Sequence, residues 1–144
     1  MTTQTAAPTW FKVAAGAAVL WTVAGIAAFF MDITMSDEAL AALPDAQRAL
    51  YAERPAWVVG VYGLAVFAGL AGAILLFRRK RLSQTLLAIS LAAVIVQMGF
   101  VLFGMKAIET MGPSVAVFPS IVVLLGAAML WLSSFGARQN WLNA

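Results

Sequence analysis

The sequence predicts an all-α integral membrane protein, a four-transmembrane-helix bundle with a short amphipathic helical cap between its first two spans. Two observations predict this fold. Of the 144 residues, 63% are hydrophobic and 10% are charged, which is far from the balance of soluble domains. Four stretches also contain no charged residue and reach the ~18 to 20 residues that a helix needs to cross the hydrocarbon core: 13–31, 55–77, 82–105 and 110–137.

By length the chain is a single domain, residues 1–144. The first span could be mistaken for a signal peptide, but its apolar run exceeds the usual ~7 to 15 residues and no small-x-small cleavage site follows it. We therefore expect it to remain in the mature protein. Transmembrane helices are expected at about 10–32, 55–77, 82–105 and 113–135, and the outer cap at 36–54.

The segment between the first two spans, residues 31–57, holds seven of the fifteen charged residues and five of the six acids. Ser36 can cap a short helix whose first turn contains acids, which suit the positive helix end. Pro44 ends that helix and can begin a second one that runs to about Glu53. Leucines and alanines give both helices an apolar side, which predicts a cap over the bundle or the outer membrane surface. The alternative is a connector that only shields the helix ends.

The distribution of Lys and Arg predicts the orientation. Residues 78–81 are all basic and join the second and third spans, while Lys12 and Arg138 lie near the two termini. Short loops rich in Lys and Arg stay in the cytoplasm. We therefore expect a multi-pass protein of the bacterial inner (cytoplasmic) membrane, with both termini cytoplasmic and the acidic cap outside. Because the basic run is a topology signal, no nucleic acid partner is expected.

Composition also limits the chemistry. The chain contains no cysteine and no histidine, which removes the usual zinc ligands, the commonest axial haem ligand, the thiol nucleophile and the commonest general base. We expect no enzyme activity, no catalytic residue, no metal site and no cofactor. No ionisable residue lies in the middle of a span, which argues against a proton relay or an ion-coupled pump.

A few polar and aromatic side chains lie within the spans. Gln97 is the most polar of them, and an amide in hydrocarbon needs partners, so it should face the bundle interior. Counting from the helix ends places it near the depth of Tyr62 and Ser120, with Trp21 and Thr22 level or somewhat deeper. These five residues could line a neutral pocket that opens outward and suits an uncharged polyol or sugar, or a quinone-like headgroup. The alternative is that Gln97 only joins two helices.

Small and polar residues recur at sevenfold spacing in every span, which predicts close helix packing in a left-handed bundle or against a neighbouring protomer. At the outer ends of the first and third spans lie Asp32 and Lys106. Because these two helices run in the same direction, an ion pair between Asp32 and Lys106 is expected. The alternative is that each only anchors a helix end at the interface.

Three motifs carry a family resemblance: TMSDEALAALPDAQRALYAERPAW at 34–57, VQMG at 96–99 and MGPS at 111–114. With them the chain resembles a family of small bacterial four-helix inner-membrane proteins that are often labelled sugar transporters. The similarity spans most of the chain. It implies the four-helix topology and a transport role, and it transfers no site residues.

Two functions are compatible with these features. The first is an oligomeric transporter or channel-like carrier for a small neutral solute such as a sugar. The second is an accessory or assembly subunit of a larger inner-membrane complex, with the small-residue stripes and the acidic cap docking its partners. The expected surroundings are the lipid bilayer and either further copies of the chain or a larger membrane complex.

Overall fold

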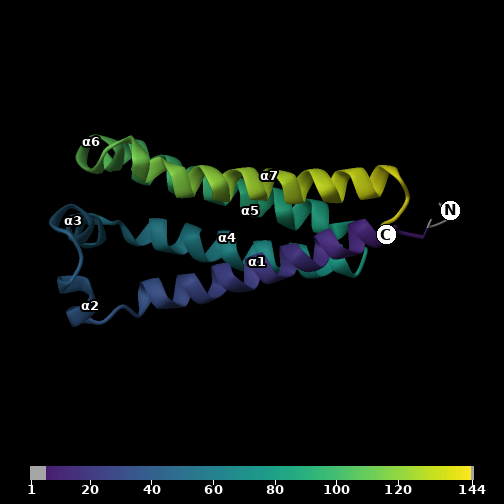
Figure 1. Cartoon of the computed structure of the whole chain (residues 1–144), viewed down its shortest axis with the longest axis horizontal. Coiled ribbons are helices and arrows are strands. Elements are labelled where there is room, and N and C mark those ends of the chain that lie inside the picture. The colour runs from purple at the N-terminus through teal and green to yellow at the C-terminus, as the bar shows by residue number, and fades with distance from the viewer. Residues whose placement is uncertain (1–5, 144) are drawn as a thin grey trace.

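The computed structural model describes residues 6–143, which form helices joined by short turns, without a β-strand in that part of the chain. Four helical spans are long and apolar enough to cross a membrane: Thr9–Ile33, Ala56–Phe77, Leu82–Gly104 and Pro113–Arg138. These spans confirm the predicted all-α class with four long apolar helices. They lie roughly along one axis (Figure 1).

The helices alternate between long apolar segments and short connecting ones. In chain order they are α1 (Thr9–Ile33), α2 (Asp37–Ala41), α3 (Asp45–Glu53), α4 (Ala56–Phe77), α5 (Leu82–Gly99), the π-helix η1 (Phe100–Gly104), α6 (Ala107–Met111), the 3-10 helix η2 (Pro113–Ala116) and α7 (Val117–Arg138).

Local sequence explains where α2, α3 and α4 begin. Ser36 accepts a hydrogen bond from the Ala39 backbone N–H and so caps α2, as its position predicts. Pro44 and Pro55 immediately precede α3 and α4 with extended backbones. The apolar side of this α2–α3 segment, which includes Leu40, Leu43 and Leu50, is only partly covered, since no residue of either helix is buried.

The end of the third span differs from the continuous helix predicted over 82–105. α5 stops at Gly99, and in η1 the Met105 N–H reaches back five residues to the Phe100 C=O (2.8 Å). Lys106 then adopts a left-handed backbone with φ 61°, and α6 follows. π-Helical turns frequently mark functional positions. Hydropathy cannot predict this π-helical turn, because the residues of η1 are as apolar as those of the α-helix before it.

α4 and α5 form an antiparallel hairpin in which the backbones approach closely. A Cβ atom added to Gly72 would lie 2.8 Å from Leu87 Cγ, and one added to Gly69 would lie 3.0 Å from Ser90 Oγ. The small residues of α4 therefore face α5, as expected where no hydrophobic effect drives helices together. α1 packs on α4 and α7 packs on α5 (Figure 1).

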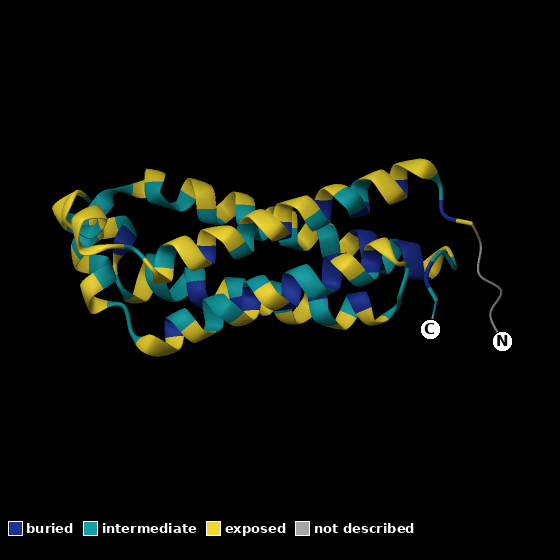
Figure 2. Ribbon diagram, turned by 90° about the horizontal axis from the view of Figure 1, so that it is seen from below, coloured by how far each residue is buried: buried dark blue, intermediate teal, exposed yellow. Residues whose placement is uncertain are grey.

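The buried core lies toward one end of the bundle. We call this the basic end, because it contains the turn 78–81, and we call the opposite end, with the α2–α3 segment, the acidic end. The core cluster includes Phe11, Leu76, Leu87 and Leu132. Figure 2 shows buried residues concentrated toward the end where the chain termini lie. The core cluster therefore lies at the basic end, although Val58 is also buried near the acidic end.

Candidate functional site

The basic end of the bundle is closed by side-chain contacts between α1, α5 and α7. Ser83 Oγ on α5 lies 2.6 Å from Ser133 Oγ on α7, and both residues are fully buried. Phe11 on α1 packs directly on Gly136, where an added Cβ atom would lie 2.8 Å from the Phe11 ring. These contacts fill the interior of the described bundle at this end.

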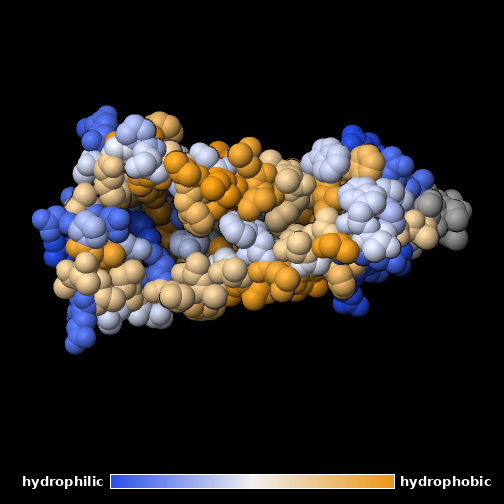
Figure 3. All heavy atoms as spheres, in the orientation of Figure 1, coloured by the Kyte–Doolittle hydropathy of each residue, from blue (hydrophilic) through white to orange (hydrophobic). Residues whose placement is uncertain are grey.

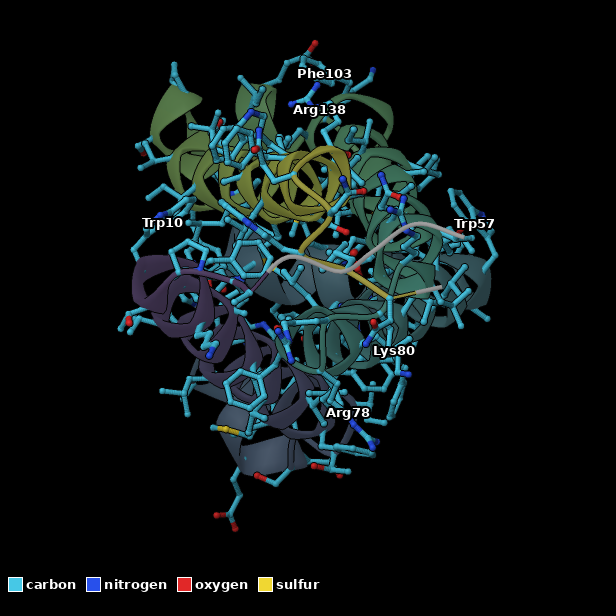
Figure 4. The ribbon with its side chains drawn as sticks, turned by 90° about the vertical axis from the view of Figure 1, so that its right-hand side faces the viewer. Trp10, Trp57, Arg78, Lys80, Phe103 and Arg138 are labelled. Carbon is cyan, nitrogen blue, oxygen red and sulfur yellow. The ribbon has the colours of Figure 1, made fainter. Side chains whose placement is uncertain are left out.

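The C-terminal tail reinforces the closure by pairing with the turn between α4 and α5. The Arg81 N–H donates to the Asn143 C=O (2.7 Å), and the Asn143 N–H donates to the Arg79 C=O (2.5 Å). Figure 4 looks onto this end, where Arg78 and Lys80 lie across the bundle from Arg138. The charged side chains thus surround a closed end.

A cavity of about 330 Å³ lies between the four long helices, beyond this core. Most of its wall is aliphatic or aromatic, with contributions from every long helix, including Trp21, Val66, Leu91, Phe118 and Val122. None of the described residues that line it carries an ionisable carboxylate, ammonium or guanidinium group. The cavity is therefore suited to an uncharged and largely apolar molecule.

Two of the polar side chains in this cavity are satisfied by backbone carbonyls. The Thr22 hydroxyl donates to its own helix, 3.0 Å from the Ala18 carbonyl oxygen and 2.9 Å from that of Val19. The Ser90 hydroxyl donates across the hairpin to the Ala65 carbonyl of α4 (2.6 Å). The proton of each hydroxyl therefore has a partner without a ligand.

Gln97 differs from these two residues. Its side chain lines the cavity and only 6% of the residue is exposed, yet within residues 6–143 its amide has no hydrogen-bond partner. The Tyr62 hydroxyl, on the facing helix α4, is likewise unpaired in the described part of the chain. Among the described residues, Asp32 Oδ2 is the one fully inaccessible side-chain polar atom without a partner, so the unpaired Gln97 amide atoms remain accessible from the cavity. The cavity thus contains an unsatisfied polar position at Gln97.

The cavity opens between α1 and α7. These two helices meet at the basic end, where the Trp10 and Phe135 rings lie 6.2 Å apart, and they diverge toward the acidic end (Figure 1). Trp21 of α1 and Phe118 of α7 line the cavity but are 36% and 63% exposed. Figure 3 shows the face between these helices, hollowed toward the acidic end.

An ion pair lies at the acidic end of the same region. Arg54 Nη2 is 2.8 Å from Asp32 Oδ2, a close contact that is not aligned as a hydrogen bond, and the two side chains are only 18% and 12% exposed. The partner of Asp32 is therefore Arg54, and the prediction of Lys106 as its partner is wrong. The reason is that α1 packs against α4 rather than α5, so the end of α1 meets the start of α4.

Tyr51 joins this pair from α3. Burial, a hydrogen bond with Asp32 and the negative charge of Asp32 together raise the pKa of Tyr51 to about 12, against a smaller opposing effect of Arg54. The Arg54 guanidinium also lies over the Tyr51 ring, 4.9 Å from its centroid. Three residues predicted as part of a cap or a helix end therefore form one polar cluster.

Four of the five predicted pocket residues line the cavity, namely Gln97, Tyr62, Trp21 and Thr22. Ser120 is the exception, because it is exposed and its hydroxyl donates to the Ala116 carbonyl of its own chain segment (2.7 Å). Phe118 and Val122 of α7 line the cavity, and Ser120 lies two positions from each of them. Two positions correspond to a rotation of ~200° around the helix, so Ser120 points away from the cavity. Counting residues from the helix ends predicts the depth of a side chain in the membrane but not the direction in which it points.

Ser90 is the polar lining residue that the pocket prediction missed. It shares the sevenfold stripe with Gln97, so the same spacing could have identified it. Among the described residues there is no group of three or more Asp, Glu, Cys or His side chains placed to hold a metal ion.

Comparison of the chain with protein-family models, with curated proteins and with solved structures found no match. The pocket therefore provides the basis for a functional proposal.

Proposed function

We propose that this protein is a membrane carrier, or a channel-like protein, that binds one small neutral molecule in the pocket around Gln97. The observation that carries the proposal is the amide of Gln97, a residue that is only 6% exposed. The amide faces a cavity formed by all four long helices and has no hydrogen-bond partner among the described residues. A ligand with a hydrogen-bonding group can pair with this amide from within the cavity.

The neutrality of the ligand follows from the cavity wall. An ionised group brought into the pocket would lose its hydration without meeting an opposite charge, which is strongly unfavourable. The charged residues Asp32 and Arg54, at the junction of α1 and α4, already pair with each other.

The proposal places the protein in the bacterial inner membrane with the basic end in the cytoplasm, in line with the preference of Lys- and Arg-rich loops for that side. Four helices leave little room for alternating access within one protomer, so a symmetric dimer is part of the proposal. The cavity then opens toward the outer half of the bilayer.

The test is equilibrium binding to the purified full chain in lipid nanodiscs. The probes are radiolabelled glucose, glycerol and a benzoquinone that carries a ten-carbon chain. We expect at least one probe to bind with 1:1 stoichiometry and Gln97→Leu to weaken that binding by about tenfold or more, since tenfold corresponds to ~1.4 kcal/mol. Ser120→Ala is the matched control, because Ser120 lies outside the cavity, and it should bind as the wild type does.

The proposal fails if none of the probes binds, or if Gln97→Leu binds as tightly as the wild type. In that case co-purification of a stable larger membrane complex would favour the accessory or assembly role instead. Uptake into liposomes that contain only the purified protein then separates a carrier from a binding protein.

A further inference from the structure

We infer that the ligand of this pocket is an uncharged amphiphile that enters sideways from the bilayer between α1 and α7, with its hydrogen-bonding headgroup at Gln97 and its hydrocarbon chain in the gap. This inference rests on the proposed function and narrows it from any neutral molecule to one chemical class.

The hydrogen-bonding capacity of the pocket argues against a sugar. A sugar carries several hydroxyl groups, and each hydroxyl that enters an apolar wall without a partner is penalised. Thr22 and Ser90 already use their hydroxyl protons on backbone carbonyls. The unpaired groups described above are the amide of Gln97 and the hydroxyl of Tyr62, which match a headgroup with one or two polar atoms.

The shape of the opening argues for entry from lipid. Trp21, Ala24 and Ala28 on α1 line the cavity and are also exposed, and Phe118 on α7 has the same dual position. These residues belong to spans that are apolar enough to cross a membrane. In a bilayer the gap between α1 and α7 would therefore meet acyl chains, and an apolar chain crosses this boundary without losing hydration.

The other two routes are less suited to an amphiphile. At the basic end the core around Phe11 and the Ser83–Ser133 contact close the bundle. At the acidic end the charged Asp32 and Arg54 side chains lie where α1 ends and α4 begins, and an apolar chain would have to pass them. The gap between α1 and α7 is the remaining path. A ligand that enters there can place its headgroup inside the cavity while its hydrocarbon chain extends toward the lipid.

The test uses the fluorescence of Trp21, which is part of the cavity wall. The full chain in lipid nanodiscs is titrated with the ten-carbon benzoquinone, since quinones quench indole emission. We expect saturable quenching that disappears in Trp21→Phe and shifts to about tenfold higher concentration in Gln97→Leu. Trp131→Phe is the matched control, because Trp131 is exposed on α7 and does not line the cavity; it should keep the saturable component.

Two further arms test the chain and the route. Benzoquinone without the chain should bind at least tenfold more weakly than the chained quinone. If the headgroup site accepts a hydroxyl group, 1-dodecanol should displace the chained quinone. If 1-dodecanol does not displace it, the site selects a carbonyl acceptor. Ala28→Trp, which fills the gap, should weaken binding of the chained quinone. Ala27→Trp is its control, because Ala27 is exposed but does not line the cavity.

The outcomes separate the two proposals. Binding of glucose with Gln97 dependence, together with no saturable quinone binding, overturns the amphiphile and leaves the proposed function standing. Equal binding of the chained and unchained quinones, or unchanged binding in Ala28→Trp, overturns the side entry. Absence of binding by every probe overturns both.

Discussion

Ser83 Oγ lies 2.6 Å from Ser133 Oγ in a fully buried contact that joins α5 to α7 at the basic end of the bundle. At the opposite end the wall between α1 and α7 is open and Gln97 has no partner in the described chain. The bundle is thus closed at one end and hollow toward the other.

The serine contact should contribute measurably to stability. Interhelical hydrogen bonds in membrane proteins average about 0.6 kcal/mol and reach about 1.7 kcal/mol. We expect a double-mutant cycle of Ser83→Ala and Ser133→Ala to give a coupling energy in this range, measured by denaturant unfolding in mixed micelles. Strictly additive single substitutions would show that the contact is not formed.

The hairpin of α4 and α5 should not tolerate added volume at Gly72. A Cβ atom there would lie 2.8 Å from Leu87 Cγ and 3.1 Å from the Leu87 backbone nitrogen. Gly72→Ala should therefore destabilise the bundle by about 1 to 3 kcal/mol, as overpacking commonly does. Gly60→Ala is the control, because nothing lies within 4 Å of a Cβ atom at Gly60; a loss of melting temperature as large as that of Gly72→Ala would contradict the packing.

Gln97 and Ser90 should respond differently to the loss of their polar groups. The Gln97 amide is unpaired in the described structure, so Gln97→Leu should leave the free energy of unfolding unchanged or raise it slightly. Ser90→Ala removes the hydrogen bond to the Ala65 carbonyl and should lower the free energy of unfolding by about 0.5 to 1.5 kcal/mol. Marked destabilisation by Gln97→Leu would instead support the role of Gln97 as a link between helices.

The partner of Asp32 can be identified by charge substitution. Asp32→Asn leaves the largely buried Arg54 without its counter-ion, and we expect a loss of about 1 to 3 kcal/mol, below the ~3 to 5 kcal/mol of a fully buried pair. The reversed pair Asp32→Arg with Arg54→Asp should recover part of this loss. Lys106→Ala should have the same free energy of unfolding as the wild type. If Lys106→Ala lowers this free energy as much as Asp32→Asn does, Asp32 pairs with Lys106, as the sequence predicts.

The titration of Tyr51 should report the polar cluster at the acidic end. Its pKa is raised from 10.0 to about 12, so the folded state holds the phenol proton more tightly than the unfolded state does. The associated stability is present below pH 10 and falls as the pH rises from 10 to 12. In a Tyr62→Phe background, where Tyr51 is the only tyrosine, ultraviolet absorbance should show phenolate formation near pH 12. Asp32→Asn should move this midpoint toward 10.

Much of the fold could be predicted because its signals are local. Uninterrupted apolar runs identify the four long helices, and Ser36, Pro44 and Pro55 mark helix starts through their own backbone chemistry. The inward position of Gln97 could also be predicted, since an amide avoids hydrocarbon wherever its helix packs.

The sequence by itself thus determined the helices, the difference in charge between the two ends and most of the polar pocket residues. Only the tertiary structure decided that Arg54 pairs with Asp32, that Ser120 faces away from the cavity and that α1 and α7 part toward the acidic end. The reason is physical. Hydropathy and capping act within one helix, whereas the choice of neighbouring helix and the rotation about each axis depend on how all four helices pack together.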